Sequence, residues 1–105
     1  MEIIETPIFT SLIEKLLSAE EYRGPQLALA LRPRQGALIR GGGGIRKLRW
    51  GRRGMGKRGG LRFIYYWVGP EQTIYMLFVY RKTRQTDLTN GQVKVLRQLV
   101  REEFK

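Results

Sequence analysis

The chain has 105 residues, with 20 Lys or Arg, 9 Asp or Glu and no Cys or His, which gives a formal net charge of +11 at pH 7. This length fits a single domain over residues 1–105 with a modest core. The lack of Cys and His excludes disulfides, a thiolate nucleophile, an imidazole base and the usual zinc ligands. No apolar run is long enough to span a membrane, and Glu2 and Glu5 stand where a signal peptide would be basic, so we expect a cytoplasmic protein with no membrane contact.

The positive charge is concentrated in the middle of the chain. Residues 22–70 contain 12 Lys or Arg and no acidic residue, whereas the rest of the chain contains 8 basic and 9 acidic residues. Aromatic residues are interleaved with the basic ones, among them Trp50, Tyr65, Tyr66 and Trp67. Basic side chains displace counterions from a phosphate backbone and aromatic rings stack on bases, so the pattern favours a nucleic acid partner over a merely solvated basic face.

The N-terminal residues predict a short strand followed by a helix. Residues 2–5 have a β-like pattern, and Thr6 and Pro7 then fit an N-cap and the first helical position. Apolar residues at helical spacing form the expected core face of this helix: Ile8, Phe9, Leu12, Ile13, Leu16 and Leu17.

A second helix is expected to begin after Ser18, because Ser18 and Glu21 have the spacing of a capping box, and to end before Pro33. Gly24 and Pro25 lie inside this helix, and proline removes one intrahelical hydrogen bond, so we expect a kink or a restart there. The apolar residues that the helix carries are Tyr22, Leu27 and Leu31.

Residues 37–50 predict one strand that starts with a glycine-rich part. Alternation along its second half places Lys47 and Arg49 on one face and Leu48 and Trp50 on the other. The strand therefore packs with one side and offers two cations on the other.

The remaining residues predict a loop, a hairpin and a helix. A basic loop is expected over residues 51–60, and residues 61–68 and 73–80 are β-branched and aromatic runs that favour an antiparallel hairpin. Thr89 and Gln92 have the spacing of a capping box, and the helix that follows has an apolar stripe of Val93, Leu96, Leu99 and Val100. The order β, α, α, β, β, β, α predicts a small α+β domain with helices packed on an antiparallel sheet of three or four strands.

Two familiar phosphate chemistries do not fit. Residues 51–58 come close to the phosphate-binding loop of nucleotide hydrolases, but Arg58 replaces the hydroxyl that holds magnesium and the segment lies between two strands. Metal-dependent nucleases need clustered carboxylates, whereas Glu71 and Asp87 are isolated and are predicted as turn residues. We therefore expect neither a metal nor a cofactor.

Cleavage of RNA without a metal remains compatible with this composition. In that reaction the 2′-hydroxyl of the substrate attacks the adjacent phosphate, and lysine and arginine supply positioning, proton transfer and charge stabilisation. A lysine surrounded by cations has a lowered pKa and can act as a base, while arginine stays charged. DNA lacks the attacking hydroxyl, so this route implies an RNA substrate.

Three sequence blocks occur in order: GGGGIRKLRW at 41–50, GKRGGLRFIYY at 56–66 and VYRKTRQTDLT at 79–89, preceded by EEYR at 20–23. Together they resemble the RelE/HigB branch of toxins from bacterial type II toxin-antitoxin modules, over nearly the whole chain. The resemblance implies a microbial-RNase-like fold and a ribosome-dependent endoribonuclease that cuts mRNA in the ribosomal A site. It also implies a cognate antitoxin, which we expect to be acidic where it covers the basic cleft.

The resemblance assigns roles to five basic residues. Lys47 and Arg49 would lie at the scissile phosphate as base and electrostatic stabiliser, and Lys57 would join them from the loop. Arg62 would clamp the phosphate, and Lys82 would be the general acid for the leaving 5′-oxygen. Some relatives stack a base on a tyrosine where this chain has Asp87 and Leu88, so stacking is expected from Tyr80 or Trp50 instead. The expected RNA contacts are Arg40, Arg46, Trp50, Arg52, Arg53, Arg58, Tyr80 and Arg84.

Two other functions stay open. The same cations could follow a nucleic acid backbone without cleaving it, as in a non-catalytic RNA- or DNA-binding module. A gyrase-poisoning toxin on the same fold is the third hypothesis, but such relatives generally lack the basic catalytic set, which this chain retains.

Overall fold

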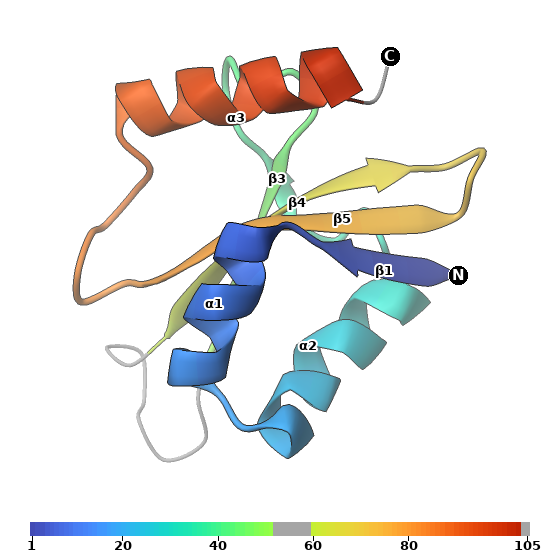
Figure 1. Cartoon of the computed structure of the whole chain (residues 1–105), viewed down its shortest axis with the longest axis vertical. Helices are drawn as coiled ribbons and strands as arrows, with labels where there is room; N and C mark the ends of the chain where they lie inside the picture. The colour runs from blue at the N-terminus through green and yellow to red at the C-terminus, as the bar shows by residue number, and fades with distance from the viewer. Residues whose placement is uncertain (52–59, 104–105) are drawn as a thin grey trace.

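The structure is a computed structural model, and it describes residues 1–51 and 60–103. These residues form three helices and a five-stranded sheet (Figure 1). The α+β class predicted from the sequence is therefore confirmed. In chain order the elements are β1 (Glu2–Glu5), α1 (Pro7–Leu16), α2 (Ala19–Leu31), β2 (Ala37–Leu38), β3 (Arg46–Trp50), β4 (Leu61–Val68), β5 (Thr73–Arg81) and α3 (Asn90–Glu103).

The sheet differs from the predicted antiparallel sheet of three or four strands. Its strand order is β1-β5-β4-β3-β2, and β1 runs parallel to β5 while the other neighbours are antiparallel. Just after β1, the Thr6 hydroxyl donates a hydrogen bond to the Leu77 carbonyl at 2.9 Å, across a separation of 71 residues. A pairing this distant in the chain leaves no local sequence pattern, so the sequence does not reveal that β1 pairs in parallel with β5.

The single strand predicted over residues 37–50 is also wrong. β2 and β3 are separate strands that pair antiparallel, with Ala37 opposite Lys47. The glycines between them reverse the chain, because Gly41, Gly43 and Gly44 have φ angles of 74°, 71° and 108°, a region that favours glycine. The glycine-rich part is thus a turn and not the first part of a strand.

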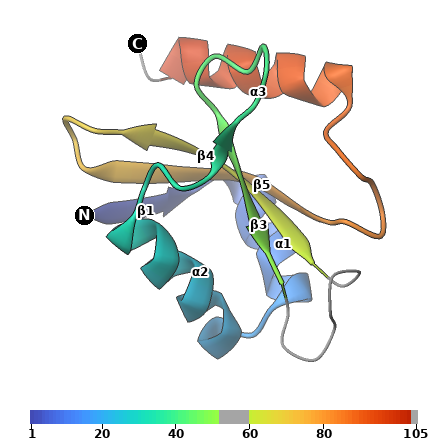
Figure 2. The same ribbon diagram turned by 180° about the vertical axis from the view of Figure 1, so that it is seen from behind.

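The two faces of the sheet carry separate hydrophobic cores. α1 and α2 cover one face, and α3 covers the other (Figures 1 and 2). Alternation along β4 sends Phe63 and Tyr65 into the first core and Ile64 into the second, and all three are fully buried. Because β4 is covered on both sides, its sequence is apolar almost throughout.

The predicted starts of the helices are confirmed. Thr6 caps α1 by accepting a hydrogen bond from the Phe9 N–H, and Pro7 occupies the first helical position. Both reciprocal hydrogen bonds of a capping box are present at the other two helices, in the pairs Ser18 with Glu21 and Thr89 with Gln92.

The helix does not restart at Gly24 and Pro25, since α2 is one helix through both residues. One of the clashes that proline makes in a helix is with the Cβ of the residue before it, and this clash is absent here because Gly24 has no Cβ. A Cβ at Gly24 would also lie 2.8 Å from Cζ2 of Trp50, so glycine lets the indole of β3 pack directly against the helix. Glycine, although a poor helix former, therefore allows close contact between α2 and the sheet at this position.

Of the three apolar residues that the sequence analysis names for α2, only Tyr22 is buried. Leu27 and Leu31 are 62% and 73% exposed, and the helix instead buries Tyr22, Pro25 and Leu29. These three residues share one helical face, which Pro25 completes as an apolar residue. In α1 the same correction applies to Ile8, which is 56% exposed.

Candidate active site

Three of the predicted catalytic cations lie on the α3 face of the sheet. In β3, Leu48 is buried in the core under α1 and α2, so Lys47 and Arg49 on either side of it face the other way. In β4, Arg62 lies between two residues of that same core and likewise faces α3, where it is only 8% exposed. The register sets Arg49 directly opposite Arg62.

Tyr80 of β5 completes this row, because it pairs with Arg62 on the other side of β4. The register between β4 and β5 shifts at Ile64 and Tyr65, so that Leu77 has no partner in β4. This bulge changes the alternation and leaves Tyr80 in the core under α3. Three neighbouring strands therefore contribute Arg49, Arg62 and Tyr80 to one line across the sheet.

One carboxylate partly offsets the repulsion between the neighbouring cations Lys47, Arg49 and Arg62. Like charges directly opposite in a sheet repel each other. Asp87 Oδ1 lies 2.7 Å from Lys47 Nζ, and this is the only ion pair among the residues that the structure describes. The hydrogen bond and the charge of Lys47 lower the pKa of Asp87, and Arg49 and Arg62 lower it further. The carboxylate thus occupies the position that the cations offer to an anion.

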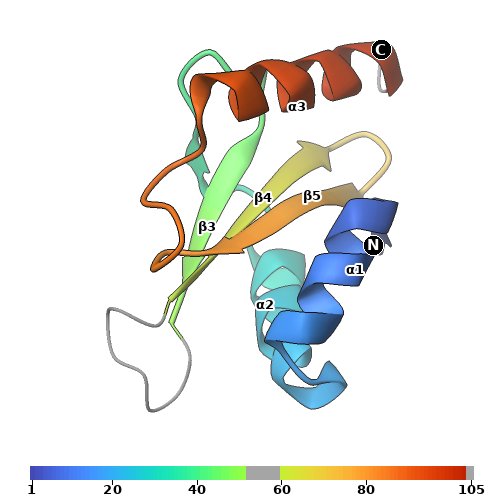
Figure 3. The same cartoon turned by 60° about the vertical axis from the view of Figure 1, so that its left-hand side comes forward.

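Asp87 lies in the segment that joins β5 to α3 (Figure 3), and its carboxylate reaches Lys47 of β3. Gln85 Nε2 donates hydrogen bonds to the Asp87 carbonyl at 2.8 Å and to Gln92 Oε1 at 2.9 Å. Gln92 Oε1 also accepts from the Thr89 N–H, so the cap of α3 fixes the segment. Sequence reasoning missed this role of Asp87. The available signal was that Asp87 is the only acidic residue between Glu71 and Glu102.

Tyr80 supplies a second polar group beneath the cations. Its side chain is 5% exposed, and its hydroxyl has no hydrogen-bond partner among the described residues. Burial raises the pKa of the Tyr80 phenol, and the charge of Asp87 raises it further, while Arg62 and Arg49 oppose the shift. A buried hydroxyl without a hydrogen-bond partner is costly to the folded state.

The predicted stacking roles do not fit this arrangement. The Tyr80 ring is buried and packs against Phe78 with ring centroids 5.9 Å apart, so it offers no open face to a base. Trp50 faces the opposite side of the sheet, where it packs against the first core. Alternation along β3 already separated Trp50 from Lys47 and Arg49.

The other predicted residues are not gathered at this cluster. Lys82 is exposed directly after β5, where its N–H donates to the Gly60 carbonyl at 3.0 Å. Arg46 faces the α2 side and donates to backbone carbonyls of Arg34 and Gly36. Two exposed residues lie in connections, Arg40 before the glycine turn and Arg84 after β5. The predictions for Arg52, Arg53, Lys57 and Arg58 lie outside the described residues.

The substitution Asp87→Asn is expected to lower the free energy of unfolding at neutral pH by less than about 1 kcal/mol, because the carboxylate is exposed and its ion pair is screened by water. The pKa of Asp87 lies below its ordinary value of 3.8 in the folded protein. The stabilisation is therefore complete above that ordinary value and is lost as the pH falls through the lowered one.

Urea unfolding of both proteins from neutral pH down to about pH 2 measures this difference. The two stabilities should converge at the acid end of the series. A difference that persists or grows as the pH falls would contradict a stabilising Asp87 carboxylate.

A scan of the chain against models of known protein families finds no match. Within the described ranges, no helix is long and apolar enough to cross a membrane. The chemistry that can indicate a function is that of a cluster, which we call the cation cluster and which consists of Lys47, Arg49, Arg62, Tyr80 and Asp87.

Proposed function

We propose that this protein is a metal-independent endoribonuclease of the RelE/HigB type, the toxin of a type II toxin-antitoxin module that cuts mRNA in the ribosomal A site and inhibits translation. The observation that carries the proposal is the cation cluster, in which Lys47 forms an ion pair with Asp87, Arg49 lies directly opposite Arg62, and all three cations lower the pKa of that carboxylate. Arginines directly opposite each other weaken a sheet, so their pairing favours a binding role for a doubly coordinated anion such as phosphate.

The proposed reaction uses the charges of the cluster. The scissile phosphate replaces Asp87, and Arg49 and Arg62 hold its non-bridging oxygens as negative charge develops. The 2′-hydroxyl gives up its proton as its oxygen bonds to phosphorus, the bond from phosphorus to the 5′-oxygen breaks, and that oxygen takes a proton. Lys47 is the candidate base, and Lys82 is the candidate acid, since it follows Tyr80 closely in the chain.

The proposal also includes the fold family of the domain. A microbial-RNase-like, RelE-like fold is consistent with a mixed sheet that packs two helices on one face and leaves cations on the other. The proposed partners are mRNA, the ribosome and a cognate antitoxin whose acidic residues cover the cluster, all in the cytoplasm. Charge complementarity of this kind speeds association, so binding of the antitoxin should slow as salt is added.

The second candidate function is a non-catalytic nucleic-acid-binding module. It is favoured by the position of Lys82, which has no described contact with the cation cluster. In such a module, loss of any one cation lowers affinity by a similar small step and reduces the salt dependence of binding.

The test is induction of the chain in a bacterial host beside the variants Arg62→Ala, Lys82→Ala and Arg81→Ala, with primer extension on a translated message to map new 5′ ends. Arg81 pairs with Leu61 on the α1 and α2 side of the sheet and serves as the matched control. We expect growth arrest and cuts inside the coding frame from the original chain and from Arg81→Ala. Both effects should be lost in the other two variants and when translation is blocked.

Equal cutting by all four proteins would overturn the assignment of the site. No cutting by any of them, with RNA binding retained, would leave the binding module as the function.

A further inference from the structure

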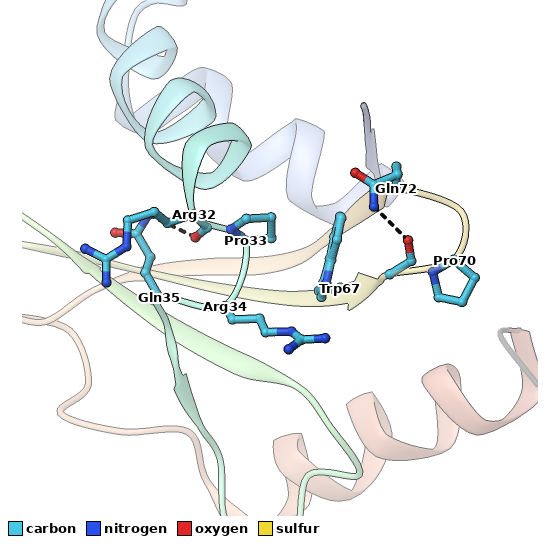
Figure 4. Close-up of a pocket in the computed structure, with 8 residues that line it drawn as sticks. Arg32, Pro33, Arg34, Gln35, Trp67, Pro70 and Gln72 are labelled. Atoms are coloured by element: carbon cyan, nitrogen blue, oxygen red, sulfur yellow. Dashed lines mark hydrogen bonds between the residues drawn. The ribbon is translucent and has the colours of Figure 1, made fainter.

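A second basic pocket lies at the other end of β4, between the C-terminus of α2 and the turn that joins β4 to β5 (Figure 4). Its volume is about 560 Å³, which is in the range of ligand sites. The lining residues are Arg32, Pro33, Arg34, Gln35, Trp67, Gly69, Pro70 and Gln72.

This pocket is separate from the cation cluster. Arg62 is the residue of the cation cluster that lies in β4, and Trp67 follows five residues later in the same strand. An odd number of steps puts the two side chains on opposite faces, and five residues of strand span roughly 17 Å. One nucleotide therefore cannot occupy the cation cluster and this pocket at the same time.

The segment that carries the pocket's two arginines is held rigidly. The Tyr65 hydroxyl accepts a hydrogen bond from the Gly36 N–H at 2.9 Å and donates one to the Pro33 carbonyl at 2.6 Å. Arg46 Nη1 donates to the carbonyls of Arg34 and Gly36, at 3.0 and 2.9 Å. The backbone of this segment is therefore fixed by buried or half-buried groups of the sheet.

One side chain of this segment stabilises the end of α2, and two others are exposed to solvent. Gln35 Nε2 donates to the carbonyls of Ala28 and Arg32 and so closes the end of α2. Arg32 and Arg34 are exposed, and within the described residues neither has a carboxylate within ion-pair distance. The rigid segment thus presents two cations that are available to an outside anion.

Trp67 adds a flat aromatic surface to these charges. The ring is partly buried against the first core, and it stands between the segment 32–35 and the turn with Pro70 and Gln72 (Figure 4). Arg34 extends toward the ring, whereas Arg32 points away from it. Gln72 has a φ of 51°, which is unfavourable for a residue with a side chain and places its amide at the edge of the pocket.

We propose that this pocket binds one nucleotide of a single-stranded RNA, with its base stacked on Trp67 and its phosphate paired with Arg34. A planar ring beside a cation matches the two parts of a nucleotide, and stacking on tryptophan accepts any base. Arg32 would meet a neighbouring phosphate on the far side of the segment. Binding here goes beyond the proposed cleavage, because it requires neither the cation cluster nor catalysis.

The test is a titration of the full chain with a 2′-O-methyl RNA hexanucleotide, which cannot be cleaved by attack of its own 2′-oxygen. NMR of the two indole N–H groups reports on Trp67 and on Trp50, which packs on the same face next to Gly24 and serves as the internal control. We expect the Trp67 resonance to shift at low micromolar to millimolar hexanucleotide while that of Trp50 stays in place.

Two variants separate stacking from charge. Trp67→Leu should weaken binding about fivefold or more with the same salt dependence, because stacking involves no counterions. Arg34→Gln should weaken binding and reduce the slope of log K against log salt by about 0.7, the value for one phosphate contact on a single strand. Lys94→Gln on α3 removes the same charge elsewhere and should change affinity less than about twofold.

Three outcomes would overturn the proposal. If polyphosphate moves the Trp67 resonance as much as the hexanucleotide does, the base is not recognised. If an acidic peptide binds here and the RNA does not, the pocket is a protein contact. If Arg34→Gln and Lys94→Gln weaken binding equally, attraction is nonspecific. Arg34 is exposed, so its variant remains informative even where Trp67→Leu fails to fold.

Discussion

Replacement of Arg62 by methionine is expected to slow single-turnover cleavage of ribosome-bound mRNA by roughly 100- to 1000-fold, the usual cost of removing one preorganised donor to a developing anion. Methionine keeps most of the apolar stem that β4 buries at this position, so the fold should be retained. Arg62 is 8% exposed, and its charge acts where water screens it weakly. Cleavage at saturating ribosome concentration isolates the chemical step from binding.

The matched control is Arg81→Met, because Arg81 pairs with Leu61 next to Arg62 but belongs to the opposite face of the sheet. Its cleavage rate should stay within about twofold of the original. Affinity for the ribosome should be nearly unchanged in both variants. If Arg62→Met loses activity only through weaker ribosome binding, Arg62 holds a backbone phosphate away from the scissile bond and the proposed reaction is wrong.

The part of the site that follows from a local repeat could be predicted from the sequence. Lys47 and Arg49 alternate with Leu48 and Trp50, and burial of Leu48 determines which face the cations take. Arg62 is flanked by two apolar residues, so the same rule assigns it to that face once β3 and β4 are paired. Capping boxes are equally local, and both were found.

The rest of the site depends on contacts between distant segments. Asp87 is paired with Lys47 across 40 residues, and only the path from β5 to α3 brings the carboxylate there. The burial of Tyr80 depends on a bulge in β5, which no single strand pattern reveals. β1 has a β-like local pattern, but its parallel pairing with β5 depends on the folded sheet. In each case the local sequence pattern does not show which distant segment makes the contact.

The second large effect is expected from removing one phenol oxygen in the sheet. Tyr65→Phe should lower the free energy of unfolding by about 2 kcal/mol, which for a chain of this size is roughly 8–15 °C in Tm. The Tyr65 hydroxyl holds both Gly36 and Pro33, and without it the buried Gly36 N–H loses its acceptor. The arginines of the second pocket would then lie on a looser segment, so RNA binding at Trp67 should weaken as well.

Tyr80→Phe is the same chemical change with the opposite expected sign. The Tyr80 hydroxyl is buried without a partner among the described residues, so its removal should leave stability unchanged or raise it by up to about 1 kcal/mol. If the hydroxyl donates to the phosphate that replaces Asp87, cleavage should fall about tenfold in this more stable variant. Thermal unfolding and single-turnover cleavage are measured for Tyr65→Phe and Tyr80→Phe. The first variant loses a hydroxyl that stabilises the fold, and the second loses a hydroxyl that we expect to bind the phosphate. Equal destabilisation by both changes would mean that the Tyr80 hydroxyl already has a structural partner, and its proposed part in catalysis would be withdrawn.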